Sequence, residues 1–124
     1  MAAPNIVNVA LINANSNTQI LSTSSEIGLL SNPASSGKVY KVNTILVANR
    51  DGTAAVDVTC NIYSAAALSG TGFPIASTIS VPADATLILS DKSTAFYLEE
   101  NRSIGIKSGT ANGLSVLCSW EEIS

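Results

Sequence analysis

The stretch that decides the fold is "SIGIKSGTANGLSVLCSWEEI", residues 103–123. Apolar and polar residues alternate on both sides of an Asn112-Gly113 pair, and a period of two is typical of a strand with one buried face. Asn-Gly supplies the positive φ that a tight turn needs. The predicted inward residues are Ile104, Ile106, Leu114, Val116, Cys118 and Trp120. The stretch offers no obvious reactive group, so it indicates packing rather than chemistry.

The same alternation occurs in two earlier segments. "VYKVNTILVA" (39–48) predicts one inward set and "VDVTCNIY" (56–63) predicts another, each facing a polar side. The first set is Tyr40, Val42, Thr44, Leu46 and Ala48, and the second is Val56, Val58, Cys60 and Ile62. Between the segments, Asp51-Gly52 is a hairpin signal. We therefore expect these two strands to be antiparallel neighbours.

The second half of the chain contains further strand and turn signals. "FPIASTISV" (73–81) predicts Ile75, Ile79 and Val81 on one inward face, and Pro82 suits the first corner of a turn. Beyond it, Phe96 and Leu98 are expected inward, before a charged corner at 99–102. Turn signals recur every ~8 to 12 residues, as in a β-sandwich or small barrel. The sequence predicts an all-β protein: one antiparallel β-sandwich of about eight strands, jelly-roll or immunoglobulin-like.

The amino-terminal third is less regular. "NIVNVALI" (5–12) is a plausible strand, and "TQILSTSSEIGLLS" (18–31) predicts one or two weaker strands. Residues 31–37 read as a loop, and "SAAALSGTG" (64–72) as a short helical turn or a loop. A chain of 124 residues fits a single domain. We expect one sandwich over 1–124, with 1–17 as an extended arm or the first strand.

Composition narrows the possible partners. The chain is 46% hydrophobic and only 12% charged, with a net charge of -3; soluble proteins average about 25% charged residues. Its six basic residues are scattered, which argues against a nucleic-acid partner. The amino terminus lacks the positive region of a signal peptide, and no apolar run is long enough to span a membrane. We therefore expect no membrane partner, and synthesis in a cytoplasm. A charge-poor surface suits coverage by another protein.

Catalytic groups are scarce. The chain has no histidine and no nucleotide-binding or nucleophile-elbow motif, so we predict no enzyme activity and no catalytic, cofactor or metal site. Two alternatives stay open. Acidic corners could bind Ca²⁺, although the loop spacing is missing, and paired carboxylates could serve a hydrolase or isomerase. The acidic residues in question are Asp84, Asp91, Glu99, Glu100, Glu121 and Glu122.

The two cysteines fall on predicted inward faces. Cys60 and Cys118 could form a disulfide across the sandwich. Small buried thiols in a reducing compartment are the favoured interpretation.

Three segments resemble small virion structural proteins of tailed bacteriophages, notably marine and cyanobacterial phages. They are "MAAPNIVNV", "SSGKVYKVNTILVANRDGTAAVDVTCNIY" and "PIASTISVPADATLILSDKSTAFYLEENRSIGIKSGTANGLSVLCSWEEI". The resemblance implies a β-sandwich component of the virion. It implies a head decoration (cement) protein that binds the major capsid protein or another virion protein, with a tail or neck component as second choice. It further implies a homo-oligomer, with a trimer favoured, and brings no catalytic motif.

Two segments are predicted to contact the partner because the sandwich explains them least. They are Ala2–Asn17 and Ser64–Phe73, which are rich in apolar or small residues. A sugar-binding or receptor-binding module on a tail fibre is the remaining alternative. It would depend on the outward aromatic residues Tyr63, Phe73 and Tyr97.

Overall fold

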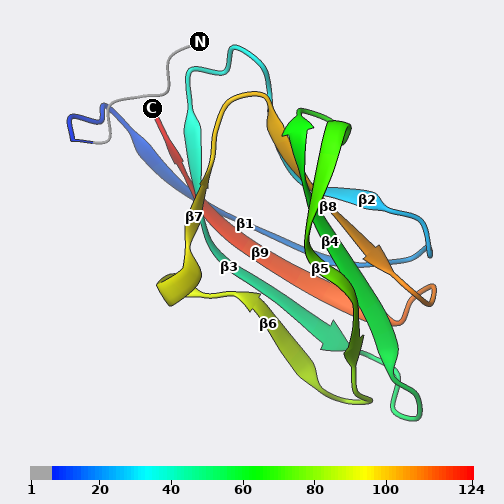
Figure 1. Ribbon diagram of the computed structural model, residues 1–124. Coiled ribbons are helices and arrows are strands. Elements are labelled where there is room, and N and C mark those ends of the chain that lie inside the picture. Colours follow the sequence, from blue (N-terminus) through cyan, green and yellow to red (C-terminus); the bar gives the residue numbers. More distant parts are fainter. Residues whose placement is uncertain (1–6) are drawn as a thin grey trace.

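The computed structural model describes residues 7–124, which form nine strands and one short 3-10 helix. The elements are β1 (Ile12–Ile20), β2 (Ile27–Asn32), β3 (Val39–Asn49), β4 (Val56–Ala65), β5 (Ser69–Val81), β6 (Thr86–Ser90), η1 (Lys92–Thr94), β7 (Phe96–Leu98), β8 (Arg102–Ser108) and β9 (Leu114–Ile123). Two antiparallel sheets pack face to face, as predicted (Figure 1). Sheet A has the order β1-β9-β3-β6 with β7 also on β3, and sheet B has the order β2-β8-β4-β5.

The pairing pattern is that of a jelly roll. The first strand pairs with the last, β2 with β8, β3 with β6 and β7, and β4 with β5. β6 and β7 together occupy one strand position beside β3. The strands therefore pair as in one long hairpin that is wrapped into two sheets. The structure thus selects the jelly roll from the two sandwich types that the sequence left open.

The prediction of a hairpin between neighbouring strands at Asp51-Gly52 is wrong. β3 belongs to sheet A and β4 to sheet B, so the loop between them crosses the sandwich. The buried Asn49 side chain fixes this crossing, because its Nδ2 donates to Val81 O at 2.8 Å and to Ala54 O at 3.0 Å. The predicted turn at Asn112-Gly113 is confirmed, with Asn112 at φ 61°, but it too joins strands of different sheets.

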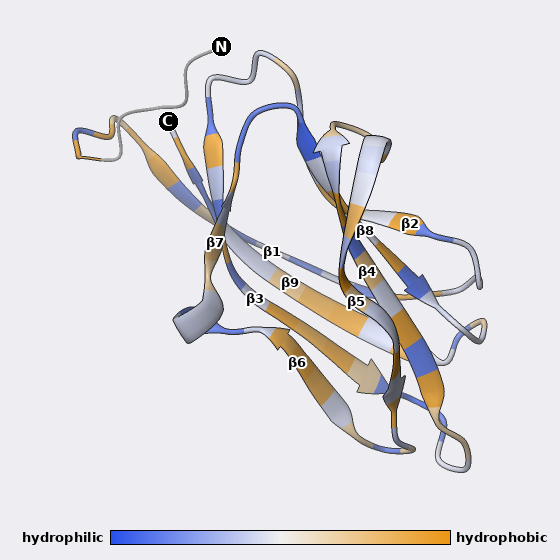
Figure 2. Cartoon of the chain, in the orientation of Figure 1, coloured by the Kyte–Doolittle hydropathy of each residue, from blue (hydrophilic) through white to orange (hydrophobic). Residues whose placement is uncertain are grey.

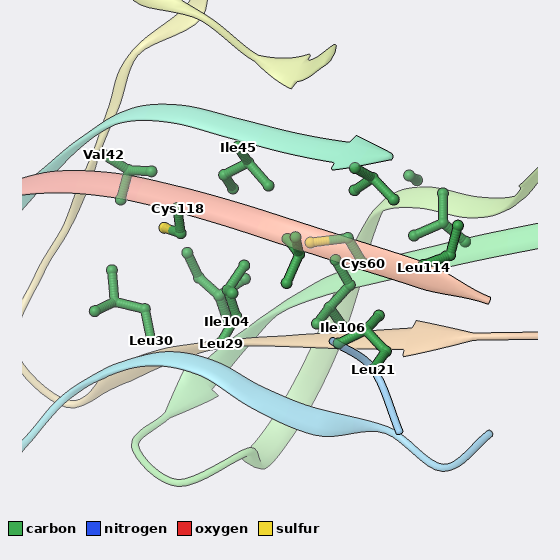
Figure 3. Packing of buried hydrophobic residues seen from close by; sticks show 14 of the residues in the cluster. Leu21, Leu29, Leu30, Val42, Ile45, Cys60, Ile104, Ile106, Leu114 and Cys118 are labelled. Carbon is green, nitrogen blue, oxygen red and sulfur yellow. The ribbon is translucent and has the colours of Figure 1, made fainter. Parts of the chain in front are cut away.

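The core lies between the inner faces of the two sheets (Figure 3). Most predicted inward residues are buried there: Tyr40, Val42, Val56, Val58, Cys60, Val81, Leu98, Ile104, Ile106, Leu114, Val116 and Cys118. Three others, Ile62, Phe96 and Trp120, are partly buried and pack against this cluster. The alternation in β4, β8 and β9 therefore identified the core correctly.

The second half of β3 faces the opposite way from the prediction. Its register with β9 shifts between Val42 and Thr44, which marks a β-bulge. One extra residue reverses the alternation that follows it. Ile45 and Val47 consequently point into the core, and the predicted inward residues Thr44, Leu46 and Ala48 lie on the outer face.

Two predicted inward residues of β5 are also exposed. Ile75 is 45% exposed and Ile79 is 42% exposed, whereas Ala76 is buried. The pairing of β5 with β4 shifts register three times, and Thr78 has a φ of 47°. Ile79 lies opposite the buried Val58 and so keeps the predicted face, where it is exposed because β5 is an edge strand. The shifts change the alternation in the part of β5 that precedes Ile79.

Residues 64–72 form a hairpin turn rather than a helical turn or a loop. β4 extends to Ala65 and β5 begins at Ser69, with Ala67 and Leu68 both at φ 57°. β4 and β5 are the one pair of consecutive strands that are also neighbours within a sheet, among the elements of residues 7–124.

The amino-terminal strand begins later than predicted. β1 starts at Ile12, so residues 7–11 lie outside it, and positions 5 and 6 lie outside the described residues. The stretch 18–31 contains the end of β1 and most of β2, as expected of two strands. The loop predicted over 31–37 begins after Asn32.

Candidate interaction surface

The outer face of sheet A carries two rows of uncharged side chains across four strands. In one row, Thr18 is opposite Leu117, Leu117 opposite Leu46, and Leu46 opposite Ile88. The next row consists of Ile20, Ser115, Ala48 and Thr86. Residues directly opposite in antiparallel strands project from the same face. We call these eight residues the sheet-A patch.

The sheet-A patch is largely apolar and accessible. Ile88 is 57% exposed and Ile20 is 47% exposed, while Leu46 and Leu117 are half-buried. A shallow depression of about 550 Å³ lies over most of the patch. In Figure 2 the middle parts of β9, β3 and β6 are largely orange, because the central residues of these strands are apolar on both faces. A strand apolar on both faces is typical of one that is covered on both sides.

The patch is bordered by charge at one end of the sheet. Lys41 lies opposite Glu121 and Tyr97, and Asn43 Nδ2 donates to Glu121 Oε2 at 3.0 Å. An apolar centre with a polar margin is the arrangement found in protein interfaces.

The outer face of sheet B is occupied by its own polar contacts. Asn61 Nδ2 donates to Glu26 Oε2 at 2.8 Å, and the Tyr63 hydroxyl donates to Glu26 Oε1. The hydrogen bond to Glu26 raises the pKa of Tyr63. Gly105 leaves room for this arrangement, since a Cβ there would lie 2.8 Å from Glu26 Oε2.

The β4–β5 turn covers the neighbouring part of sheet B. Leu68 N donates to Ser103 Oγ at 2.8 Å, and Ala67 N donates to Ser31 Oγ at 3.1 Å. Residues 67 and 68 of the predicted contact segment 64–73 are therefore held against their own sheet. Its last residue, Phe73, is 57% exposed.

The other predicted contact segment, 2–17, is divided by the structure. Residues 12–17 belong to β1 and form part of sheet A. Ala10 N and Leu11 N both donate to Ser124 O, so residues 10 and 11 lie against the end of the chain. Residues 2–6 lie outside the described part.

The acidic residues take local structural roles. Glu122 forms a salt bridge with Lys38 at 3.1 Å, Glu100 accepts from Gly37 N at 3.1 Å, and Asp91 accepts from Ser93 N at 2.9 Å. Within residues 7–124, no group of three or more acidic or cysteine side chains could hold a metal ion. Glu99, Glu100, Glu121 and Glu122 line none of three depressions of the described surface, those around Ile20, Thr59 and Ile62.

Both cysteines are free thiols in the core (Figure 3). Burial, together with the smaller electrostatic effects of Cys118 and Glu26, raises the pKa of Cys60 to about 12. Burial likewise raises the pKa of Cys118 to about 12. These thiols are protonated at neutral pH and are poor nucleophiles.

The outward aromatic residues do not form one site. Tyr63 is held by Glu26 on sheet B, Phe73 lies on β5 of the same sheet, and Tyr97 lies on β7 of sheet A. Phe73 and Tyr97 are 57% and 48% exposed.

A second apolar hollow lies where the two sheets separate at one edge. Ile62 and Ile75 of sheet B face Leu89 and Phe96 of sheet A across about 350 Å³. Sequence reasoning missed both this hollow and the sheet-A patch. The available signal for the patch was the unbroken apolar run "ILVA" (45–48), which a strand with one wet face would not contain.

Comparisons with known proteins add little. No family model and no curated protein matches the chain. One similar solved chain comes from the structure of infectious bursal disease virus Gx strain; it is 10% identical, with a TM-score of 0.38 over 90% of this chain and 37% of that chain. A likeness this weak establishes neither a family nor a function. No helix of the described residues has the length and apolar character needed to cross a membrane.

Proposed function

We propose that this chain is a non-enzymatic structural component of a phage virion, namely a decoration or cement protein bound to the mature head shell. The observation that carries the proposal is the sheet-A patch, eight uncharged residues on the solvent side of a four-stranded surface. The sequence resemblance to phage virion proteins supplies the class. Jelly rolls occur in viral capsid proteins but also in lectins and cupins, so the fold supports this class only by analogy.

The physical basis is coverage of an apolar surface at small electrostatic cost. Covering the aliphatic groups of the patch is favourable, its three hydroxyls need only hydrogen-bond partners, and no charge has to be desolvated. A shell presents the same site many times, so linked copies gain from multivalency and each contact can be weak. A protein that binds only the mature shell stabilises that state through mass action.

The proposed partner is the major capsid protein or another virion protein, and the proposed location is the virion, assembled in the host cytoplasm. The patch would face the shell, and the polar outer face of sheet B would face solvent. Neither nucleic acid nor membrane enters the proposal, since the patch carries no Lys or Arg to neutralise phosphate.

The binding test uses two isoleucines of similar exposure on different sheets. Ile88→Glu places a charge in the sheet-A patch, and Ile79→Glu places the same charge on β5 of sheet B. The purified variants are mixed with head shells that lack the protein and then sedimented. We expect Ile88→Glu to lose shell binding and Ile79→Glu to retain it, with both variants folded by circular dichroism.

Retained binding by Ile88→Glu together with lost binding by Ile79→Glu would refute this use of the patch. Immunogold labelling of intact virions tests the location. Gold on the heads supports the proposal, whereas gold on tails would replace it with the second candidate.

The second candidate is a tail, neck or fibre component, including a glycan-binding or receptor-binding module. It is favoured only by the exposed rings of Phe73 and Tyr97, which could stack on a sugar. Saturable binding on a glycan array that is lost in Phe73→Ala would support it. The absence of such binding together with gold on the heads would dismiss it.

A further inference from the structure

The free edge of β1 differs from the other strand edges of the sandwich. β1 pairs with β9 in an unbroken register from Ile12 opposite Ile123 to Ile20 opposite Ser115. On its other side, no strand of residues 7–124 pairs with it. An unpaired strand edge presents backbone donors and acceptors that another strand can bind.

The hydrogen bonds at the end of the ladder show which residues face the open edge. Leu11 N donates to Ser124 O, and Ser124 N donates to Leu11 O, so Leu11 directs its backbone groups toward β9. Backbone direction alternates along a strand. The even-numbered residues Ile12, Ala14, Ser16, Thr18 and Ile20 therefore direct their backbone N–H and C=O groups toward the open edge.

The usual protections of an edge strand are missing from β1. Proteins protect edges with charges, proline, bulges or short strands. β5 contains Pro74 and three register shifts, β2 is bulged after Gly28, and β6 has only five residues. β1 is nine residues long, "INANSNTQI", without a charge, proline, glycine or bulge.

We propose that β1 pairs with β1 of a second copy of this chain, antiparallel, about a two-fold axis at Ser16. In this register Ile12 lies opposite Ile20 of the second copy, Ala14 opposite Thr18, and Ser16 opposite Ser16. The even residues that face the edge then form roughly ten backbone hydrogen bonds, two for each of five opposed pairs. The result is one continuous sheet through both copies.

The side chains favour a second copy as the occupant. The strand pairs with itself without placing any charge opposite a like charge, since it has none. On the outer face, the exposed Ile12 and Ile20 meet at both ends of the interface. The paired sheet joins the two sheet-A patches into one larger uncharged surface. The dimer does not depend on the proposed virion role, because it is tested on the purified chain.

The test measures the oligomeric state by sedimentation velocity. Ser16→Pro removes an N–H that faces the open edge and leaves the β9 ladder intact, so we expect the dimer dissociation constant to rise at least tenfold. Ser16→Lys and Ser16→Glu each place like charges on the axis, and each alone should weaken the dimer several-fold. An equal mixture of these two charge variants should restore dimers, because opposite charges then meet.

Ser80→Lys on β5 is the matched control and should remain as dimeric as the unmodified chain, since Ser80 is exposed on sheet B. Restored dimers in the mixture also show that the charge variants are folded. A monomeric unmodified chain at the highest attainable concentration would overturn the inference. So would a trimer, or any oligomer that is indifferent to all three Ser16 substitutions.

Discussion

The two outer faces of the sandwich have nearly opposite surfaces although the sheets share one core. On sheet B, Glu26 binds Asn61 and Tyr63, and the β4–β5 turn folds over Ser103. On sheet A, the sheet-A patch consists of aliphatic, Ala, Ser and Thr residues. None of their side chains forms a hydrogen bond among those found for residues 7–124. On sheet B, Glu26 and the β4–β5 turn bind several of the outer polar groups, whereas sheet A presents a surface suited to a partner.

The largest expected difference compares adjacent residues of β9 on opposite faces. Val116→Asp puts an unpaired charge into the core and should lower the free energy of unfolding by about 4 kcal/mol or more. Leu117→Asp lies on the outer face of sheet A and should cost about 1 kcal/mol. Urea unfolding of both variants measures the difference, and equal costs would mean that the two faces of β9 are misassigned.

The bulge in β3 predicts the next largest difference. Ile45→Ala should cost about 2 to 5 kcal/mol because it opens a cavity in the core, and Leu46→Ala about 1 kcal/mol. Thermal and urea unfolding measure both values. A larger cost for Leu46→Ala than for Ile45→Ala would show that Leu46 is the buried residue. The alternation of β3 would then continue without a bulge, and Leu46 would not belong to the sheet-A patch.

The buried thiols test whether the core that both sheets share is closed to solvent. Their pKa values near 12 in the folded state exceed the ordinary value of 9.0, so the unfolded chain releases these protons first as the pH rises. Stability is therefore fully present below pH 9 and falls between pH 9 and 12, by roughly 1.4 kcal/mol per pH unit for each thiol. The double variant Cys60→Ala with Cys118→Ala should show a flatter profile. A native chain whose thiols react with a thiol reagent at pH 8 would contradict their burial.

The smallest effect concerns the polar contacts of sheet B. Glu26→Ala removes the acceptor for Asn61 and Tyr63 and should cost about 1 to 2 kcal/mol. Glu99→Ala, an exposed residue of the β7–β8 corner, should stay within about 0.5 kcal/mol. Glu26→Ala should also lower the Tyr63 pKa toward its ordinary value, which ultraviolet titration detects. An unchanged titration would show that Glu26 does not hold this face together.

The sequence predicts the two-layer architecture and most of the core because β4, β8 and β9 alternate without interruption. It does not predict the connections. Turn signals such as Asp51-Gly52 and Asn112-Gly113 mark a change of direction, and in a jelly roll most such turns cross between sheets rather than join neighbours. Buried Asn49, which fixes one crossing, gives no local signal of its partner 32 positions away.

Bulges explain the remaining errors. One extra residue near Asn43 turns Leu46 and Ala48 outward. The register shifts between β5 and β4 interrupt the alternation of β5 around Thr78. A bulge depends on the register with the partner strand, which a single sequence does not contain. The sheet-A patch was missed for this reason, since two of its members were predicted to lie in the core.

Hydroxyl-radical footprinting of the purified chain and of assembled virions tests most directly whether the partner covers the sheet-A patch. We predict that oxidation of Leu46, Leu117 and Ile88 falls on assembly, while oxidation of Ile79 and Phe73 stays at the level of the free chain. Protection of Ile79 and Phe73 with unchanged oxidation of the sheet-A patch would contradict the account.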